Sequence, residues 1–141
     1  MTNFNDTLLQ LIVKKEMSAS AFARMVGIKD STFYDMLRSE NVTLKNALKV
    51  VDYFGTSLDY FEKKTKRFTY KFNKDYKVDL YTTVKDYLKQ YNISYLKLCR
   101  DIGISRANLT RWGQGGEPKY QTVVNLANYF KVSIDKFIGR V

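Results

Sequence analysis

The chain has 141 residues, enough for one domain or two small ones, and its 45% hydrophobic content with one proline and seven glycines is typical of packed globular cores. A single cysteine and the absence of histidine exclude a disulfide framework, an ordinary zinc site and histidine-based acid–base catalysis. The formal charge of +10 favours a polyanionic partner, which could be DNA, RNA or an anionic membrane surface.

Targeting and catalytic signals are also missing from the sequence. Residues 1–6 lack the basic and apolar regions of a secretion signal, and no apolar run approaches the roughly 18 residues that a membrane span requires. We therefore expect a cytoplasmic protein without a membrane partner. No cofactor and no enzymatic activity are expected, because the sequence contains neither paired carboxylates nor a metal-ligand cluster at a meaningful spacing.

An internal repeat organises the chain. Shifting the sequence against itself by 76 residues aligns the two halves without a gap. We therefore expect an all-α chain with a first domain at residues 1–62, a basic aromatic linker at 63–77 and a second domain at 78–141. Identical pairs include Ser18 with Ser94, Arg24 with Arg100, Gly27 with Gly103, Ile28 with Ile104, Ser57 with Ser133 and Phe61 with Phe137.

Each repeat begins with an amphipathic helix, whose apolar residues recur at i, i+4, i+7 and i+8. A second short helix follows, with Ser18 or Ser94 as its N-cap and Gly27 or Gly103 at its end, where a sharp turn favours positive φ. The apolar residues of the first helices are Phe4, Leu8, Leu11 and Ile12, matched by Leu80, Val84, Tyr87 and Leu88.

Three more helices complete each predicted bundle. The third is expected at 30–38 and 106–114, and Ser57 and Ser133 are expected to cap a short fifth helix. The sequence thus predicts two five-helix bundles. The fourth helix has its apolar residues at Leu44, Ala47, Leu48, Val51 and Phe54, matched by Tyr120, Val123, Val124, Ala127 and Phe130.

Residues 63–77 combine many lysines with an alternation of aromatic and polar residues at Phe68, Tyr70 and Phe72. The alternation fits either a short strand or an extended linker packed on a domain, and both interpretations stay open. The lysines could be solvated or could contact phosphates.

The second repeat resembles the phage repressor and Cro-like family, also called XRE-like, and the first repeat follows the same outline. The resemblance implies lambda-repressor-like helix-turn-helix domains and a sequence-specific transcriptional regulator of double-stranded DNA, with the third helix in the major groove. It rests on residues 94–99 and 103–106, Leu109, Arg111, Trp112, Gly115, Pro118 and residues 132–137.

The resemblance also implies roles for individual residues of the second repeat. Arg106, Ala107 and Arg111 fall where the family contacts base edges, and arginine can bond bidentately to guanine. Trp112 and Cys99 are expected to be buried in the core. Residues at positions that hold the phosphate backbone in the family are Ser94, Tyr95, Asn108, Gln114 and Lys119.

The first repeat departs from this pattern, because Asp30 and Asp35 replace Arg106 and Arg111. We favour Asp30 as a cap of the third helix. Residues 1–65 hold nine Lys or Arg and eight Asp or Glu, whereas residues 66–141 hold fifteen and six. A second reader would use Ser31, Thr32, Asp35 and Arg38.

Two functional hypotheses follow. The first is a repressor that occludes a promoter, since no separate ligand or activation domain is evident in the sequence. The second is an interaction or inhibitor protein of a mobile element, in which domain 1 binds a protein partner, or forms a homodimer, while domain 2 binds DNA. We favour a structural or interaction role for domain 1 over an independent reader.

Overall fold

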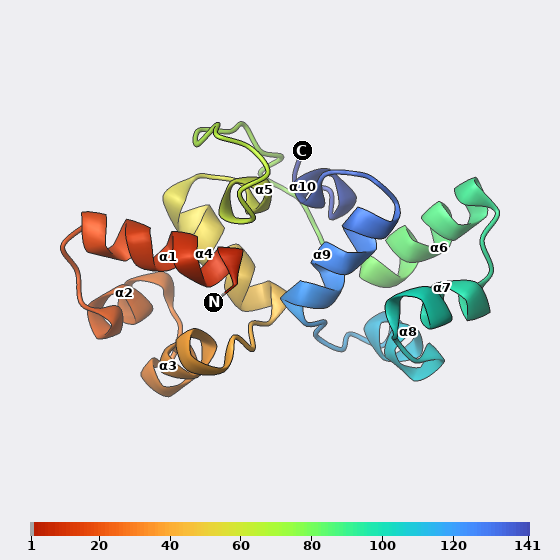
Figure 1. Ribbon diagram of the computed structural model, residues 1–141, viewed down its shortest axis with the longest axis horizontal. Coiled ribbons are helices and arrows are strands. Elements are labelled where there is room, and N and C mark those ends of the chain that lie inside the picture. The colour runs from red at the N-terminus through yellow and green to blue at the C-terminus, as the bar shows by residue number, and fades with distance from the viewer. Residues whose placement is uncertain (1) are drawn as a thin grey trace. The chain divides into compact units, whose positions relative to one another are not determined.

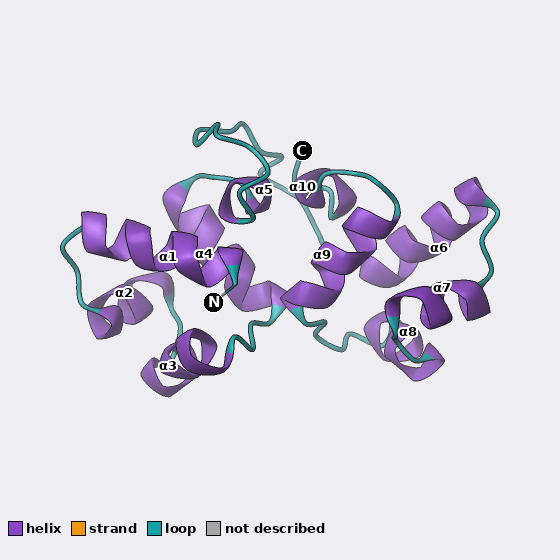
Figure 2. Cartoon of the chain, viewed as in Figure 1, coloured by secondary structure: helices purple, strands orange, loops and turns teal. Residues whose placement is uncertain are grey.

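The chain forms two compact units, the first ending at Tyr70 and the second running from Lys71 to Val141 (Figure 1). A computed structural model describes residues 2–141, and within that range helices are the only regular secondary structure (Figure 2). This confirms the all-α class. None of these helices is both long and apolar enough to cross a membrane.

The described residues of each unit form five helices in the same order, which confirms the two bundles expected from the repeat. Unit 1 contains α1 (Asn3–Lys14), α2 (Ala19–Val26), α3 (Asp30–Ser39), α4 (Leu44–Phe54) and α5 (Leu58–Phe61). Unit 2 contains α6 (Leu80–Tyr91), α7 (Tyr95–Ile102), α8 (Arg106–Gly113), α9 (Tyr120–Tyr129) and α10 (Ile134–Phe137).

Side-chain caps fix where several helices begin, since a hydroxyl oxygen accepts a hydrogen bond from an N–H of the first turn. Ser18 and Ser94 cap α2 and α7, as predicted. Ser57 and Ser133 likewise cap α5 and α10. The cap is a local interaction, so each repeat starts these helices at the same place.

Aromatic rings fill the core of each unit. In unit 1 the buried Phe22 ring has centroid distances of 5.6 Å to Phe33, 5.4 Å to Tyr53 and 5.5 Å to Phe54. Burying one such side chain contributes about 2–3 kcal/mol. In unit 2 leucines stand at the positions of Phe22 and Phe33. The aromatic contacts there join Tyr87 to Phe130 at 5.1 Å, Tyr87 to Phe137 at 5.3 Å and Phe130 to Phe137 at 6.1 Å.

The repeats also share left-handed backbone positions, although not always with the same residue. Gly55 ends α4 at a φ of 64°, and Lys131 has a φ of 57° at the corresponding point of unit 2. The opposite exchange occurs after the last helix of each unit, where Lys63 has a φ of 60° and Gly139 has a φ of 82°. The backbone path is therefore preserved through a change of residue type.

The segment between the two bundles packs on its neighbours. The Phe68 ring stands edge-on to the Tyr60 ring in unit 1, with 5.0 Å between centroids. No strand forms between residues 63 and 77, all of which the structure describes. The strand interpretation is therefore wrong, because each part of the segment packs on a helical unit and has no partner strand.

A buried arginine anchors the beginning of unit 2. The Arg140 side chain is fully buried, donates a hydrogen bond to the buried Asp135 carboxylate and stacks 3.9 Å from the Phe72 ring centroid. The backbone carbonyl oxygen of Arg140 accepts a hydrogen bond from the Asn73 N–H at 2.9 Å. Residues 71–77 thus belong to the end of unit 2 that contains α10, away from α8 in Figure 1.

Candidate nucleic-acid interface

The helices α7 and α8 are joined by a tight turn. The Ser94 Oγ accepts from the Lys97 N–H at 3.1 Å, and the Ser105 Oγ accepts from the Asn108 N–H at 3.3 Å. Gly103 ends α7 at a φ of 71°, and a β-carbon there would meet no heavy atom within 4 Å. Conformation rather than space therefore favours glycine at this turn.

One side of α8 faces the core and the other faces solvent. Leu109 and Trp112 are only 2% and 8% exposed, which confirms the core position of Trp112. Arg106, Ala107 and Arg111, the predicted base-reading residues, are all exposed. The helix therefore offers these three side chains to a ligand without disturbing the core.

Two further residues complete the exposed side of α8. The Arg111 Nη2 donates to the Asn108 Oδ1 at 2.9 Å, and Asn108 is half-buried. Thr110 is exposed and donates to the carbonyl oxygen of Arg106 at 3.3 Å. Sequence reasoning missed Thr110, although its spacing of three residues from Ala107 would have placed it on this face.

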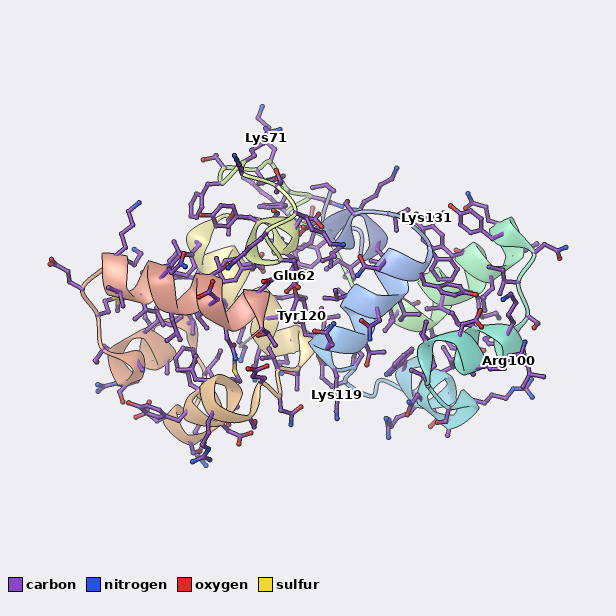
Figure 3. All side chains as sticks on the ribbon, in the orientation of Figure 1. Glu62, Lys71, Arg100, Lys119, Tyr120 and Lys131 are labelled. Carbon is purple, nitrogen blue, oxygen red and sulfur yellow. The ribbon has the colours of Figure 1, made fainter. Side chains whose placement is uncertain are left out.

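The other predicted phosphate contacts lie at helix ends. Ser94 and Tyr95 lie at the start of α7, Gln114 follows α8, and Lys119 immediately precedes α9 (Figure 3). Ser94, Gln114 and Lys119 are exposed, and Tyr95 is half-buried. Only Lys119 among these four carries a charge.

Tyr95 retains its proton near neutral pH. Burial raises the pKa of its hydroxyl, and the neighbouring Tyr81, to which it is hydrogen-bonded, raises that pKa further. The nearby Arg106 guanidinium partly offsets this rise. Tyr95 is therefore a neutral hydroxyl group beside the amino-terminal end of α8.

A hydrogen-bonded cluster fastens α7 to α9. The Asp101 Oδ2 accepts from the Lys97 Nζ at 2.8 Å and from the Tyr129 hydroxyl at 2.7 Å. The bond from Lys97, followed by that from Tyr129, lowers the pKa of the Asp101 carboxyl. Met25 stands at the corresponding position of unit 1, so this charged cluster is specific to unit 2.

The matching face in unit 1 differs in charge. Ser31, Thr32 and Arg38 are exposed on α3, and Asp35 is half-buried. The Asp35 Oδ1 lies 3.7 Å from the Arg38 Nη2, so the two charges offset each other. Tyr34, at the position of Thr110, is 49% exposed and was not predicted.

Two sequence predictions about side-chain positions are wrong. Asp30 is the first residue of α3 and does not cap it, because Lys29 has the extended backbone of the cap position and offers no acceptor oxygen. Cys99 is half-buried rather than buried. It lines an apolar hollow of about 490 Å³ together with Leu96 and Ile104.

The two units differ in net charge. Residues 1–70 hold eleven Lys or Arg and eight Asp or Glu, whereas residues 71–141 hold thirteen and six. Among residues 2–141, no group of three or more cysteine, aspartate and glutamate side chains is arranged to hold a metal ion.

Two short helices joined by a glycine turn, the second exposed along one side, define a helix-turn-helix protein. Residues 84–137 match a helix-turn-helix family model, and residues 7–59 match the model of the Cro/C1-type HTH DNA-binding domain. The chain belongs to the XRE/Cro-like helix-turn-helix family and carries two tandem copies of the domain. We found no matching curated protein and no matching solved structure. The matches support a DNA-binding regulator, and such domains are typically non-enzymatic.

Proposed function

We propose that the chain is a sequence-specific repressor that reads the major groove of double-stranded DNA with α8. The exposed face of α8 carries this proposal, because Arg106, Ala107 and Arg111 all reach solvent there. Each arginine can form a bidentate pair with guanine, worth roughly 1–3 kcal/mol of discrimination, and an alanine methyl group suits the methyl group of thymine.

The residues around α8 provide groups that suit the DNA backbone. Ser94, Tyr95, Gln114 and Lys119 offer neutral donors and one positive charge at the ends of three helices. Phosphate contacts of this kind set the register of a protein on DNA without reading sequence. Both units of the described chain are helix-turn-helix units, so occlusion of a promoter is the mode of regulation that requires no further component.

The test is a selection of bound sequences from random duplex DNA, performed with the wild type and with Arg106→Ala plus Arg111→Ala. We expect a guanine-containing motif with the wild type and its loss with the variant. Affinity for all sequences should fall steeply as salt increases, because phosphate binding releases counterions.

A matched control separates base reading from charge. Lys71→Ala plus Lys131→Ala also removes two positive charges, but from exposed positions outside α8 (Figure 3). This control should weaken binding to all sequences and keep the motif. The proposal fails if no motif is enriched, or if the α8 variant selects the same motif as the wild type.

A second candidate function assigns a protein partner, or a second copy of this chain, to domain 1. The observation that favours it is the exposed face of α3, where Asp35 offsets Arg38 and Tyr34 is half-exposed. Under this candidate, Ser31→Ala plus Arg38→Ala leaves the selected DNA motif unchanged. A shorter motif in this variant would instead identify α3 as a second reader, and an asymmetric motif would argue against a symmetric homodimer.

A further inference from the structure

We propose that Asn108 and Gly116 hold the Arg111 side chain in the position from which it reads guanine. This inference rests on the proposed function of α8. It gives Asn108 a positioning role in place of the phosphate contact that the family resemblance implies. It also gives a role to Gly116, which stands outside the predicted site.

Asn108 restrains the charged end of Arg111. The Arg111 Nη2 donates to the Asn108 Oδ1 at 2.9 Å. Because a guanidinium group only donates, this bond fixes which end of the amide faces the arginine. The backbone of Asn108 is itself fixed, since its N–H donates to the Ser105 Oγ that caps α8. The half-buried amide thus connects Arg111 to the rigid start of the helix.

Gly116 restrains the other end of Arg111. Its N–H donates to the Arg111 carbonyl oxygen at 2.8 Å, so the chain after α8 folds back onto this residue. A β-carbon at position 116 would lie 2.5 Å from the Arg111 Cγ and 2.8 Å from its carbonyl oxygen. Glycine is therefore required for space, because it lets the aliphatic part of Arg111 lie against the backbone.

A side chain restrained at both ends loses less conformational freedom when it binds. Ordering one flexible side chain at an interface weakens binding by about two- to tenfold, and a preformed orientation avoids most of that loss. The benefit should be confined to the base pair that Arg111 contacts. A phosphate contact made by Asn108 would instead affect all DNA sequences alike.

The test measures competition binding of the full chain on the wild-type selected site and on its single-base variants. We expect Asn108→Ala to lower the preference for guanine at the Arg111 position by about two- to tenfold, with other positions unchanged. Asn108→Asp keeps the acceptor, so it should retain that preference while its added charge weakens binding to every sequence. Gly116→Ala should lower the same preference as Asn108→Ala.

The double variant Asn108→Ala plus Arg111→Ala should discriminate no less than Arg111→Ala alone, because Asn108 acts through Arg111. Equal weakening on every sequence, or no change, with Asn108→Ala would overturn the positioning role while leaving α8 as the reader. If Arg111→Ala changed no base preference, the assignment of Arg111 as a reader would fail first. The two failures are therefore distinguishable.

Discussion

Substitution of Arg140 tests how unit 2 is held together. The Arg140 guanidinium is fully buried, and its interactions include an ion pair with the buried Asp135 carboxylate and a stacking contact with the Phe72 ring at 3.9 Å. Arg140→Ala removes both and leaves the Asp135 carboxylate in the interior without this cation. We expect a large loss of stability in unit 2.

The expected magnitude follows from the burial of the pair. Removing one partner of a buried ion pair costs about 3–5 kcal/mol, and a desolvated cation–π contact contributes about 2 kcal/mol. The same guanidinium makes both interactions, so these values do not simply add, and we expect a loss of about 4 kcal/mol. Domains are stable by only about 5–15 kcal/mol, so the loss should be readily measured.

The assay is urea unfolding of the full chain followed by tryptophan fluorescence. Trp112 is the only tryptophan and is buried in α8, so its signal reports unit 2. As a control, Lys63→Ala breaks an exposed pair with Asp6 in unit 1. This control should cost less than about 1 kcal/mol and leave the Trp112 transition unchanged.

A second variant isolates the buried charge. Arg140→Met plus Asp135→Asn should recover part of the stability that Arg140→Ala loses, because no ionised group then remains uncompensated in that part of the interior. A loss below about 1 kcal/mol for Arg140→Ala would refute the reasoning. It would mean that the end of unit 2 can rearrange to hydrate Asp135 at little cost.

Two further predictions concern α7. Asp101→Asn should lower the thermal midpoint of unfolding at pH 7, and the difference in midpoint from the wild type should narrow as the pH falls below about 4. The reason is that a carboxyl whose pKa is lowered by folding stabilises the folded state only while it is ionised. A difference in midpoint that does not change with pH would contradict this. Gly103→Ala should lower the free energy of unfolding by about 1–2 kcal/mol, and Gly103→Asn should lower it less, because the position needs a left-handed backbone and has free space. Equal midpoints of urea unfolding for the two variants would argue against the left-handed backbone as the cause.

Local signals in the sequence predicted most of the fold. The caps at Ser18 and Ser94 and the left-handed Gly27 and Gly103 depend on bonds and angles within a few residues, so they could be predicted without knowing the tertiary structure. The core position of Trp112 was expected from its helical spacing from Leu109 together with its position in the family. The roles expected for Arg106 and Arg111 came from the resemblance to the family and not from spacing.

The remaining features depend on contacts between distant parts of the chain. Arg140 is buried in contact with Phe72, Tyr76 and Asp135, which are distant from one another in the sequence or come from different elements, and the sequence gives no sign of such burial. The bond between Asn108 and Arg111 depends on which side-chain rotamers the surrounding turn allows, and Gly116 helps to decide that. Spacing alone could identify the face of α8 but not the restraint on Arg111.

The exchanged left-handed residues place backbone strain at a different point in each copy of the domain. Lys63 and Lys131 occupy backbone positions where the other copy has Gly139 and Gly55. A residue with a β-carbon costs about 1–2 kcal/mol in this conformation, so each copy has accepted a destabilising residue that the other avoids. Each copy therefore has the less favourable residue at one of the two sites, and neither copy is the less strained at both.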